Sequence, residues 1–245
     1  DHAQANLELA KQVYQQLETK LTINDLNRQP QKLMTGNETL ALGATQAGLD
    51  LYLAYPMTPA TGILHYFAQN SEELGVKAVQ LENEISVANA ASGATYAGTK
   101  TMLGTSGGGF ALMTEALSLA VQNETPVVYV ESQRAGPASG VPTYTQQSDL
   151  SFVLSAGHGD MTKFVIAPGD ADEAYEWGGK ALNLAWKYQT PVILLIDKQI
   201  SESTFSFDLN EQDQVQPTTY LKWEGQTPYQ RYQITDQGVS PLAFP

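Results

Sequence analysis

Four short segments of this 245-residue chain place polar or glycine residues where an apolar run ends and a helical pattern begins. The first segment is residues 55–59 (YPMTP). Prolines on both sides of Thr58 hold its backbone extended and give its hydroxyl a fixed direction, as a group that holds a small ligand requires. The same pattern is typical of a Thr that caps the following helix, and the segment alone favours this structural role.

The second segment, residues 80–84 (QLENE), ends on Glu84, just before a helical stretch of alanine, glycine and serine. A carboxylate packed against such an apolar helix loses its water and is suited to sharing a proton. The alternative, which the segment alone favours, is a solvated Glu in the first turn that the helix dipole stabilises. Glu82 is expected on the opposite face of the strand, in solvent.

The third segment, residues 105–110 (TSGGGF), predicts a glycine loop over 106–109 between a strand and a helix. Glycines in such a loop let main-chain N–H groups approach a ligand, and the start of a helix favours an anion. The segment is not a P-loop, because no Gly-Lys-Ser/Thr follows, and it is not a spaced dinucleotide fingerprint. A tight turn without a ligand is therefore an equal alternative.

The fourth segment, residues 133–143 (QRAGPASGVPT), places Arg134 just beyond a β-branched apolar run. A guanidinium can hold a carboxylate through two parallel hydrogen bonds, and a loop this rich in proline and glycine is rigid enough to orient it. Most loop arginines are solvated, and the segment alone favours that alternative. The histidines His2, His65 and His158 have no metal-ligand spacing, so no metal site is expected on this chain.

The elements that position these segments repeat about every 25 residues. Apolar runs predict six strands, and helical spacing predicts the helices between them. Because runs that are apolar throughout indicate strands buried on both faces, the sequence predicts a doubly wound α/β fold, with a six-stranded, mostly parallel sheet and helices on both faces. In such a fold, ligands bind at the carboxyl ends of the strands, where the four segments lie. The predicted strands are 51–55, 76–80, 101–105, 126–131, 163–167 and 191–197, and the predicted helices are 37–48, 60–74, 84–97, 110–122 and 172–188.

Three regions are predicted along the chain. Residues 1–35 comprise a helix over 2–19 and a linker, in which Pro30 interrupts any helical period. Residues 36–200 form the α/β domain. Residues 201–245 are polar and irregular, so we expect an extended tail that leads to a following domain.

The composition limits the classes of function. The chain carries 13 Lys and Arg against 26 Asp and Glu, a net charge of −13, and its few cations are spread along it, so nucleic acid is not an expected partner. It has no apolar run of about 18 residues and no signal-peptide pattern, so we expect a cytoplasmic protein that does not bind a membrane. Cysteine is absent, which excludes disulfides and an iron–sulfur cluster held by this sequence.

Taken together and in their order, the segments resemble one known family. They resemble the α subunit of 2-oxoacid:ferredoxin oxidoreductases, specifically its pyrimidine-binding domain for thiamine diphosphate. The resemblance runs from Gly36 to Ile200 and resumes from Tyr229 to Pro245. The motifs that carry it are GNE (36–38), YPMTP (55–59), QLENE (80–84), TSGGGFALMTEAL (105–117), QRAGPASGVPT (133–143), GHGD (157–160) and APGD (167–170).

The resemblance implies roles for the residues singled out above. It places Thr58 and Arg134 at the substrate, where Arg134 holds the carboxylate of the 2-oxoacid. It makes Glu84 the catalytic residue, which shares a proton with N1′ of the aminopyrimidine ring and so activates C2 of the thiazolium ring. It also places four residues against the cofactor in addition to Glu84, namely Tyr55, Pro56, Ser106 and Gly107.

The chain departs from the family's pattern at three positions. Met57, Ala60 and Gly108 stand where the family has its usual Ile, its usual Ser and a frequent Pro. These positions belong to the cofactor loops but spare the residues with implied roles. We therefore expect a change in the tuning of the site and not a loss of activity.

The family's activity implies the cofactors and partners. It is the oxidative decarboxylation of a 2-oxoacid to acyl-CoA and CO₂, with electrons passed to ferredoxin. Thiamine diphosphate is then shared with a β subunit, and Mg²⁺ and [4Fe–4S] clusters are expected on that partner and not on this chain. The resemblance thus implies a hetero-oligomer or dimer that binds a 2-oxoacid and coenzyme A.

The N-terminal helix resembles the link to a preceding γ domain in fused subunits. It favours 2-oxoglutarate or a related acid as the substrate, and a chain that is a fragment of a longer subunit or a split one. Two alternatives stay open. One is the pyrimidine domain of a thiamine-dependent dehydrogenase or transketolase-like enzyme, and the other is a non-catalytic module that only assembles with a partner.

Overall fold

The computed structural model describes residues 2–18 and 31–245. The chain divides into two compact units, Asp1–Gln31 and Lys32–Pro245. The first unit contains helix α1 (His2–Gln16), and no side chain of this helix is buried. A helix is therefore present where the sequence predicts one, while most of the predicted linker lies outside the described residues.

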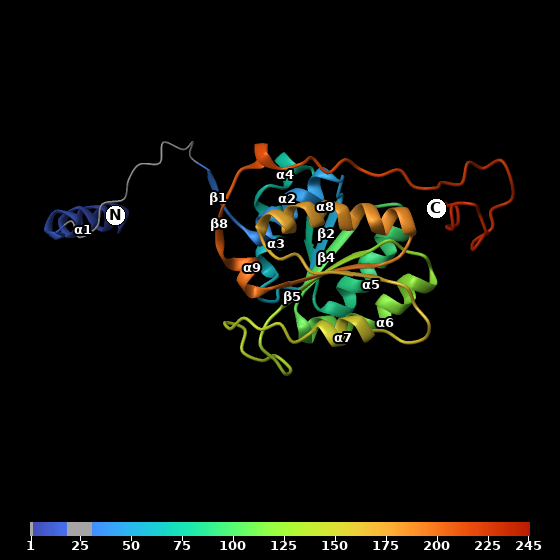
Figure 1. The fold of residues 1–245 in the computed structure, drawn as a ribbon, viewed down its shortest axis with the longest axis horizontal. Helices are drawn as coiled ribbons and strands as arrows, with labels where there is room; N and C mark the ends of the chain where they lie inside the picture. Colours follow the sequence, from blue (N-terminus) through green and yellow to red (C-terminus); the bar gives the residue numbers. More distant parts are fainter. Residues whose placement is uncertain (1, 19–30) are drawn as a thin grey trace. The chain divides into compact units, whose positions relative to one another are not determined.

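The second unit is built on a parallel sheet (Figure 1). Its strands are β2 (Leu51–Ala54), β3 (Lys77–Gln80), β4 (Thr101–Thr105), β5 (Val128–Gln133), β6 (Phe164–Ile166) and β7 (Val192–Asp197). They run in the order β3-β2-β4-β5-β7-β6, and every neighbouring pair is parallel. The middle strands β4, β5 and β7 are buried along their whole length, because helices cover both faces. The predicted six-stranded α/β sheet is confirmed.

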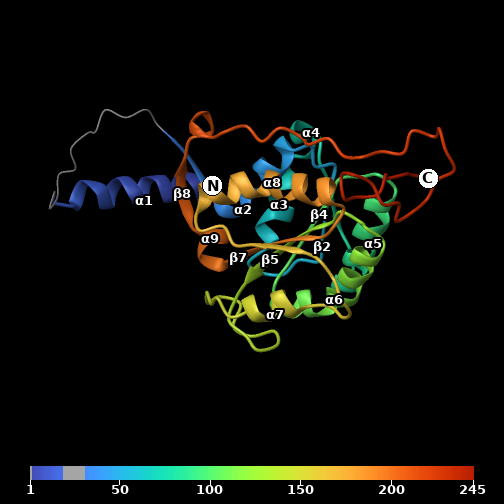
Figure 2. The same cartoon turned by 45° about the vertical axis from the view of Figure 1, so that its right-hand side comes forward.

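Two layers of helices cover this sheet (Figure 2). One layer consists of α2 (Gly36–Gln46), α3 (Thr61–Gln69) and α8 (Ala171–Tyr188), and the other of α5 (Glu84–Tyr96), α6 (Gly107–Gln122) and α7 (Leu150–Ser155). Val128 and Leu194 of the sheet pack in the first core, and their neighbours Tyr129 and Leu195 pack in the second. Each middle strand therefore sends alternate side chains into two separate cores.

The helix predicted over 60–74 is divided in the structure. Helix α3 ends at Gln69, and a separate turn, α4 (Ser71–Leu74), follows. The physical reason is Asn70, whose side-chain Nδ2 donates to the carbonyl O of Tyr66 at 2.8 Å. An Asn that bonds to the main chain in this way competes with the helical hydrogen bonds.

The structure contains a second, two-stranded sheet that the sequence does not predict. It pairs β1 (Lys32–Thr35) with β8 (Thr204–Phe207) in antiparallel register. Helix α9 (Lys198–Glu202) leads into β8. The two strands have four residues each and are far apart in the sequence, so neither period nor neighbouring sequence identifies them. The compact unit therefore extends beyond the predicted range 36–200 on both sides.

The C-terminal residues pack against helix α8. Trp186 of this helix lies against Tyr220 and Phe244, with ring centroids 4.8 and 6.1 Å away. Asn183, one turn earlier, accepts a hydrogen bond from Thr218 N at 2.8 Å. The C-terminal segment has little regular structure but is held by specific side chains.

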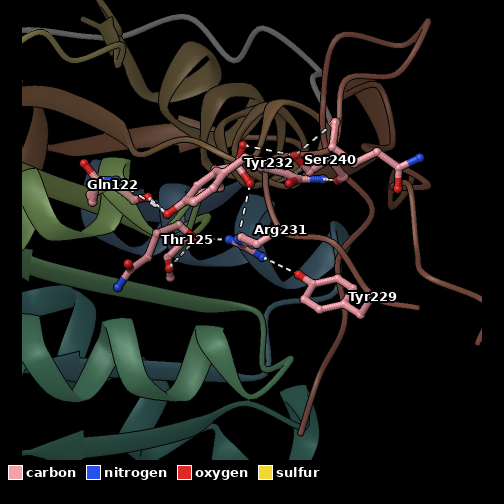
Figure 3. A network of polar contacts seen from close by, with 10 residues as sticks. Gln122, Thr125, Tyr229, Arg231, Tyr232 and Ser240 are labelled. Atoms are coloured by element: carbon pink, nitrogen blue, oxygen red, sulfur yellow. Dashed lines mark hydrogen bonds and ion pairs between the residues drawn. The ribbon is translucent and has the colours of Figure 1, made fainter. Parts of the chain in front are cut away.

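A network of polar contacts also joins this segment to the turn after α6 (Figure 3). Tyr232 Oη donates to the carbonyl O of Gln122 at 2.7 Å. Arg231 donates to the carbonyl O of Asn123, and its Nε lies 3.3 Å from Glu124 Oε2.

No helix in residues 2–18 or 31–245 combines the length and the apolar character needed to cross a membrane.

Candidate active site

The four segments singled out in the sequence lie at one edge of the parallel sheet. The first to fourth segments follow β2, β3, β4 and β5 in turn, and these strands are neighbours in the sheet. The carboxyl ends of parallel strands meet at one edge of the sheet. From β2 the chain goes outward to the edge strand β3 and then returns to β4 on the other side of β2. Such a switch point leaves a crevice between the loops of two adjacent strands, where open α/β sheets bind ligands.

Arg134 joins two of these segments. Its Nη1 donates to the main-chain O of Thr58 at 2.7 Å, and its Nη2 donates to the main-chain O of Ser139 at 2.9 Å. These two bonds hold the guanidinium plane and leave its other N–H groups for an anion. The structure thus brings Arg134 and Thr58 together, through the main chain of Thr58 and not through its hydroxyl.

Glu84 is the first residue of α5 and is 4% exposed. Asn83 caps this helix by accepting from Ser86 N at 2.8 Å, so the carboxylate of Glu84 is not used as a cap. Its Oε1 is buried and has no hydrogen-bond partner among the described residues. The solvated alternative considered for Glu84 is therefore excluded, whereas Glu82 is exposed as predicted.

Gly109 gives the carboxylate of Glu84 room to reach helix α6. A Cβ atom at this position would lie 2.7 Å from Glu84 Oε1 and 2.1 Å from Thr105 Oγ1, closer than side chains tolerate. The helix begins at Gly107, so the glycines form its first turn and not the predicted loop. Ser106 precedes it with extended backbone, and its Oγ is buried without a partner among the described residues.

The loop after β2 contacts the same crevice. Thr105 Oγ1 lies 4.0 Å from Met57 Sδ, a contact that spans the switch point between β2 and β4. Asn37, at the start of α2, donates through Nδ2 to the carbonyl O of Pro59 at 2.9 Å. The loop is therefore fastened to both neighbouring elements. Two residues predicted to contact a cofactor open this loop, Tyr55, which is exposed, and Pro56, which is half-buried.

A cavity of about 310 Å³ lies between α6 and the loop that carries Arg134. Its lining includes Arg134, Gly107, Gly108 and Asp149. The loop lies close to the helix, since a Cβ atom at Gly108 would be 3.3 Å from the carbonyl O of Ala138. A larger cavity, of about 560 Å³, lies at the other end of α6 and is lined by none of the predicted site residues.

Two carboxyl groups near this cavity were not identified from the sequence. Glu131 of β5 is fully buried and pairs in register with Thr105 of β4. Burial raises the pKa of Glu131 to about 9, and the negative charge of Asp149 acts in the same direction. Burial also raises the pKa of Asp149. The available signal was a Glu inside the apolar run 126–131, because acidic residues are rarely fully buried unless they are paired.

The segments around the switch point contain buried polar atoms that no described residue satisfies. They include Glu84 Oε1, Ser106 Oγ and Asn37 Oδ1. Because buried polar atoms are nearly always hydrogen-bonded, these three atoms require ordered water or a polar ligand as a partner. Within residues 2–18 and 31–245, no group of three or more His, Asp or Glu side chains is placed to hold a metal ion.

Comparison with known proteins identifies the family of this chain. The family model described as "Pyruvate flavodoxin/ferredoxin oxidoreductase, thiamine diP-bdg" matches residues 42–242. The 2-oxoacid:ferredoxin oxidoreductase 2, subunit alpha, of Aeropyrum pernix is 37% identical over 254 aligned positions, which cover 97% of this chain and 40% of that protein. The 2-oxoglutarate synthase subunit KorA of Methanocaldococcus jannaschii is 38% identical over 167 positions, which cover 68% of this chain and 46% of that protein.

A solved structure agrees with these relatives. The 2-oxoglutarate:ferredoxin oxidoreductase from Magnetococcus marinus, with 2-oxoglutarate, coenzyme A and succinyl-CoA bound, matches with a TM-score of 0.84 and 36% identity, over 97% of this chain and 42% of that one. This chain therefore spans about 40% of the length of relatives that match nearly all of it. The resemblance found in the motifs is confirmed. The chain belongs to the thiamine diphosphate-binding family of pyruvate flavodoxin/ferredoxin oxidoreductases and is related within it to the α subunits of the 2-oxoacid:ferredoxin enzymes.

Proposed function

We propose that this chain supplies the pyrimidine-binding half of a thiamine diphosphate site in a 2-oxoacid:ferredoxin oxidoreductase. The whole enzyme would convert a 2-oxoacid, coenzyme A and oxidised ferredoxin to acyl-CoA, CO₂ and reduced ferredoxin. The observation that carries this proposal is Glu84 Oε1, a buried atom without a partner among the described residues, which lies against Gly109 at the start of α6. A buried carboxylate of this kind is suited to a ligand that shares a proton with it.

The residues around the crevice fit an aminopyrimidine ring. Glu84 would hold this ring at N1′ and move a proton between its carboxylate and that nitrogen. Ser106 Oγ offers a further polar atom, and the glycines at 107–109 let a planar ring lie close to the main chain. When bound there, thiamine diphosphate supplies the carbon nucleophile that adds to the oxoacid carbonyl and the electron sink that decarboxylation needs.

Arg134 would bind the carboxylate of the 2-oxoacid. Its guanidinium is held by the carbonyls of Thr58 and Ser139, so it is oriented before the substrate arrives and loses little freedom on binding. The hydroxyl of Thr58 offers a second donor on the same loop. Because the sequence carries a net charge of −13, an oriented cation at the crevice is a specific means of attracting an anion.

The other parts of the reaction belong, in this proposal, to other segments and subunits. A β subunit would bind the diphosphate through Mg²⁺ and carry the [4Fe–4S] clusters that deliver electrons to ferredoxin, since this sequence has no cysteine. Residues 36–200 would supply the pyrimidine-binding elements, and residues 201–245, which belong to the same compact unit, would lead to a following domain. We favour 2-oxoglutarate as the oxoacid, because it is the substrate named for the M. jannaschii and M. marinus proteins.

Reconstitution tests this function. The full-length α subunit is produced with its β subunit and assayed for viologen reduction with a panel of 2-oxoacids. We expect dye reduction that requires both thiamine diphosphate and coenzyme A and is fastest with 2-oxoglutarate. A complex that contains its clusters but reduces no dye with any oxoacid would contradict the enzymatic function and favour a module that only assembles.

A further inference from the structure

Asn37 is a buried polar side chain that the proposed function does not use. It is the second residue of α2 and only 2% exposed. The helix start does not need it as a cap, because Thr35 and Glu38 form a capping box there, with Glu38 N donating to Thr35 Oγ1 at 3.3 Å and Thr35 N donating to Glu38 Oε2 at 2.7 Å. Asparagine has a low helix propensity and its amide costs free energy to bury, so this side chain requires a partner outside α2.

That partner is the loop 55–59, which carries Thr58. Asn37 Nδ2 donates to the carbonyl O of Pro59 at 2.9 Å, and Arg134 Nη1 donates to the preceding carbonyl O, that of Thr58, at 2.7 Å. Two consecutive carbonyls of the loop are therefore held by side chains from two distant segments. We name these two hydrogen bonds the loop clamp. The loop depends on such bonds because its two prolines have no main-chain N–H with which to anchor it.

Gly62 provides the space in which the amide of Asn37 lies. A Cβ atom at this position would be 2.5 Å from Asn37 Nδ2 and 3.3 Å from Asn37 Cβ and Cγ. Gly62 is the second residue of α3, where alanine would favour the helix more. The glycine thus permits a close approach between the start of α2 and the start of α3, and this approach brings Nδ2 to the loop.

We propose that Asn37 is a positioning residue, which holds the loop 55–59 through Pro59 O and thereby orients Thr58 and Arg134 for the substrate. The hydroxyl of Thr58 and the carbonyl that Arg134 contacts belong to the residue directly before Pro59, so both move if Pro59 is released. No bond of the substrate forms or breaks at Asn37. That the substrate is a 2-oxoacid rests on the proposed function, whereas the loop clamp does not.

The position of Asn37 predicts which kinetic parameter it affects. Asn37 lies on α2, in the helix layer with α3 and α8, whereas Glu84 lies beside Gly109 in the opposite layer, with α5 and α6. Loss of the bond to Pro59 therefore disturbs Thr58 and Arg134 and spares Glu84. Since an anchored loop loses little freedom when it binds a ligand, its release weakens binding of the oxoacid more than it slows the chemical step.

Two substitutions break the same hydrogen bond in different ways. Asn37→Ala removes the donor, and Gly62→Ala keeps Asn37 but places a methyl group where Nδ2 now lies. We expect each to raise the oxoacid KM of the assembled enzyme about three- to tenfold, with a smaller change in kcat. Gly93→Ala in α5 is the matched control for a glycine in a helix, since no atom lies within 4 Å of its added methyl group, and its KM should equal that of wild type.

The double variant tests whether Gly62 acts through Asn37. In Asn37→Ala with Gly62→Ala, the new methyl group enters space that the amide has left, so the KM should be no higher than in Asn37→Ala alone. Effects that multiply would overturn the contact between the two residues. Urea unfolding of each variant separates positioning from stability: a lower free energy of unfolding with an unchanged KM in both single variants would overturn the positioning role. Gly62→Ala keeps the buried amide and adds a good helix former, so it decides the role if Asn37→Ala does not fold.

Hydrogen exchange of the full chain gives a readout that does not depend on turnover. We expect the amides of residues 55–62 to exchange faster in Asn37→Ala and in Gly62→Ala than in wild type or Gly93→Ala. Equal protection in all four proteins would contradict the loop clamp. A wild-type complex without oxoacid-dependent dye reduction would instead contradict the proposed function, and the exchange measurement would still decide the clamp.

Discussion

Arg134 Nη1 donates to the main-chain O of Thr58 across 2.7 Å, although the two residues are 76 positions apart in the sequence. The bond joins the loop after β2 to the loop after β5, and β4 lies between these two strands in the sheet. The guanidinium therefore bridges the carboxyl end of β4, where helix α6 begins. An anion held by Arg134 would consequently lie beside the first turn of α6, whose free N–H groups and dipole also favour negative charge.

Arg134→Lys should weaken binding of the oxoacid. Lys keeps the positive charge but has no planar fork, so it cannot serve both carbonyls and a carboxylate in the present geometry. We expect the KM to rise by about 10- to 100-fold, equivalent to about 1.5–3 kcal/mol, with a smaller effect on kcat. Steady-state kinetics of the assembled enzyme measure this change. Arg231→Lys, at the opposite end of α6, is the matched control. An unchanged KM for Arg134→Lys would contradict the proposed contact between Arg134 and the substrate.

Glu84→Gln should abolish decarboxylation while leaving the fold intact. Gln has the size of Glu and remains compatible with the space beside Gly109, but it cannot exchange a proton with a ring nitrogen. We expect turnover to fall by at least about 100-fold. Glu82→Gln is the control, because Glu82 is exposed and only two residues away. Near-normal turnover in Glu84→Gln, or an equal loss in both variants, would argue against the proposed role.

Gly109→Ala should impair the site by steric overlap. The added methyl group would lie 2.1 Å from Thr105 Oγ1 and 2.7 Å from Glu84 Oε1, so buried side chains must move. We expect a loss of about 1–3 kcal/mol in the free energy of unfolding and weaker binding of thiamine diphosphate. Gly93→Ala is the matched control in α5, where no atom lies within 4 Å of the new methyl group. That variant should be stabilised by about 0.5–1 kcal/mol, and equal effects of the two substitutions would contradict the crowding at Gly109.

Arg231→Ala should loosen the C-terminal segment without changing substrate affinity. It removes the hydrogen bond to Asn123 O and the ion pair with Glu124. The side chain of Arg231 is 20% exposed and that of Glu124 is 26% exposed. Because these groups are partly screened by solvent, we expect the free energy of unfolding to fall by only about 1–2 kcal/mol. Urea unfolding and hydrogen exchange of residues 229–245 measure the change. A raised KM would mean that this network also acts at the site.

The strands could be predicted because their apolar runs are long and continuous, as in PVVYVE at 126–131. The positions of the four loops then follow from parallel topology. The burial of the Glu84 side chain could not be predicted from its own segment. This burial depends on Thr105 of strand β4 and Gly109 of helix α6. The start of α6 was misplaced for a related reason. Glycine has a low helix propensity, but close packing against Glu84 requires glycine in the first turn of this helix.

The features that were not found depend on contacts between distant residues. Strands β1 and β8 have four residues each and meet only when the unit is closed. Glu131 and Asp149 are separated by the whole Arg134 loop, and the protonation of Glu131 depends on burial that a single sequence does not display. A charged residue inside an apolar strand is the part of this signal that sequence inspection can use.

The raised pKa of Glu131 determines how the free energy of unfolding changes with pH. Its pKa is raised from 4.5 to about 9 in the folded chain, first by burial and then by Asp149. Between these values the folded state holds a proton that the unfolded state has released, so the free energy of unfolding falls as the pH rises through this range. Asp149, whose pKa is raised as well, contributes with the same sign in acid.

Glu131→Gln cannot titrate, so it isolates this contribution. We expect its free energy of unfolding, relative to that of wild type, to increase as the pH is raised from about 5.5 to about 8.5 and to level off above about 9. Urea unfolding at a series of pH values measures this difference, and the Glu124→Gln variant controls for the loss of a carboxyl group elsewhere. A difference that stays constant over the range would mean that Glu131 is already ionised in the folded chain. In that case the fold would have to accommodate a charged carboxylate that is fully buried in β5.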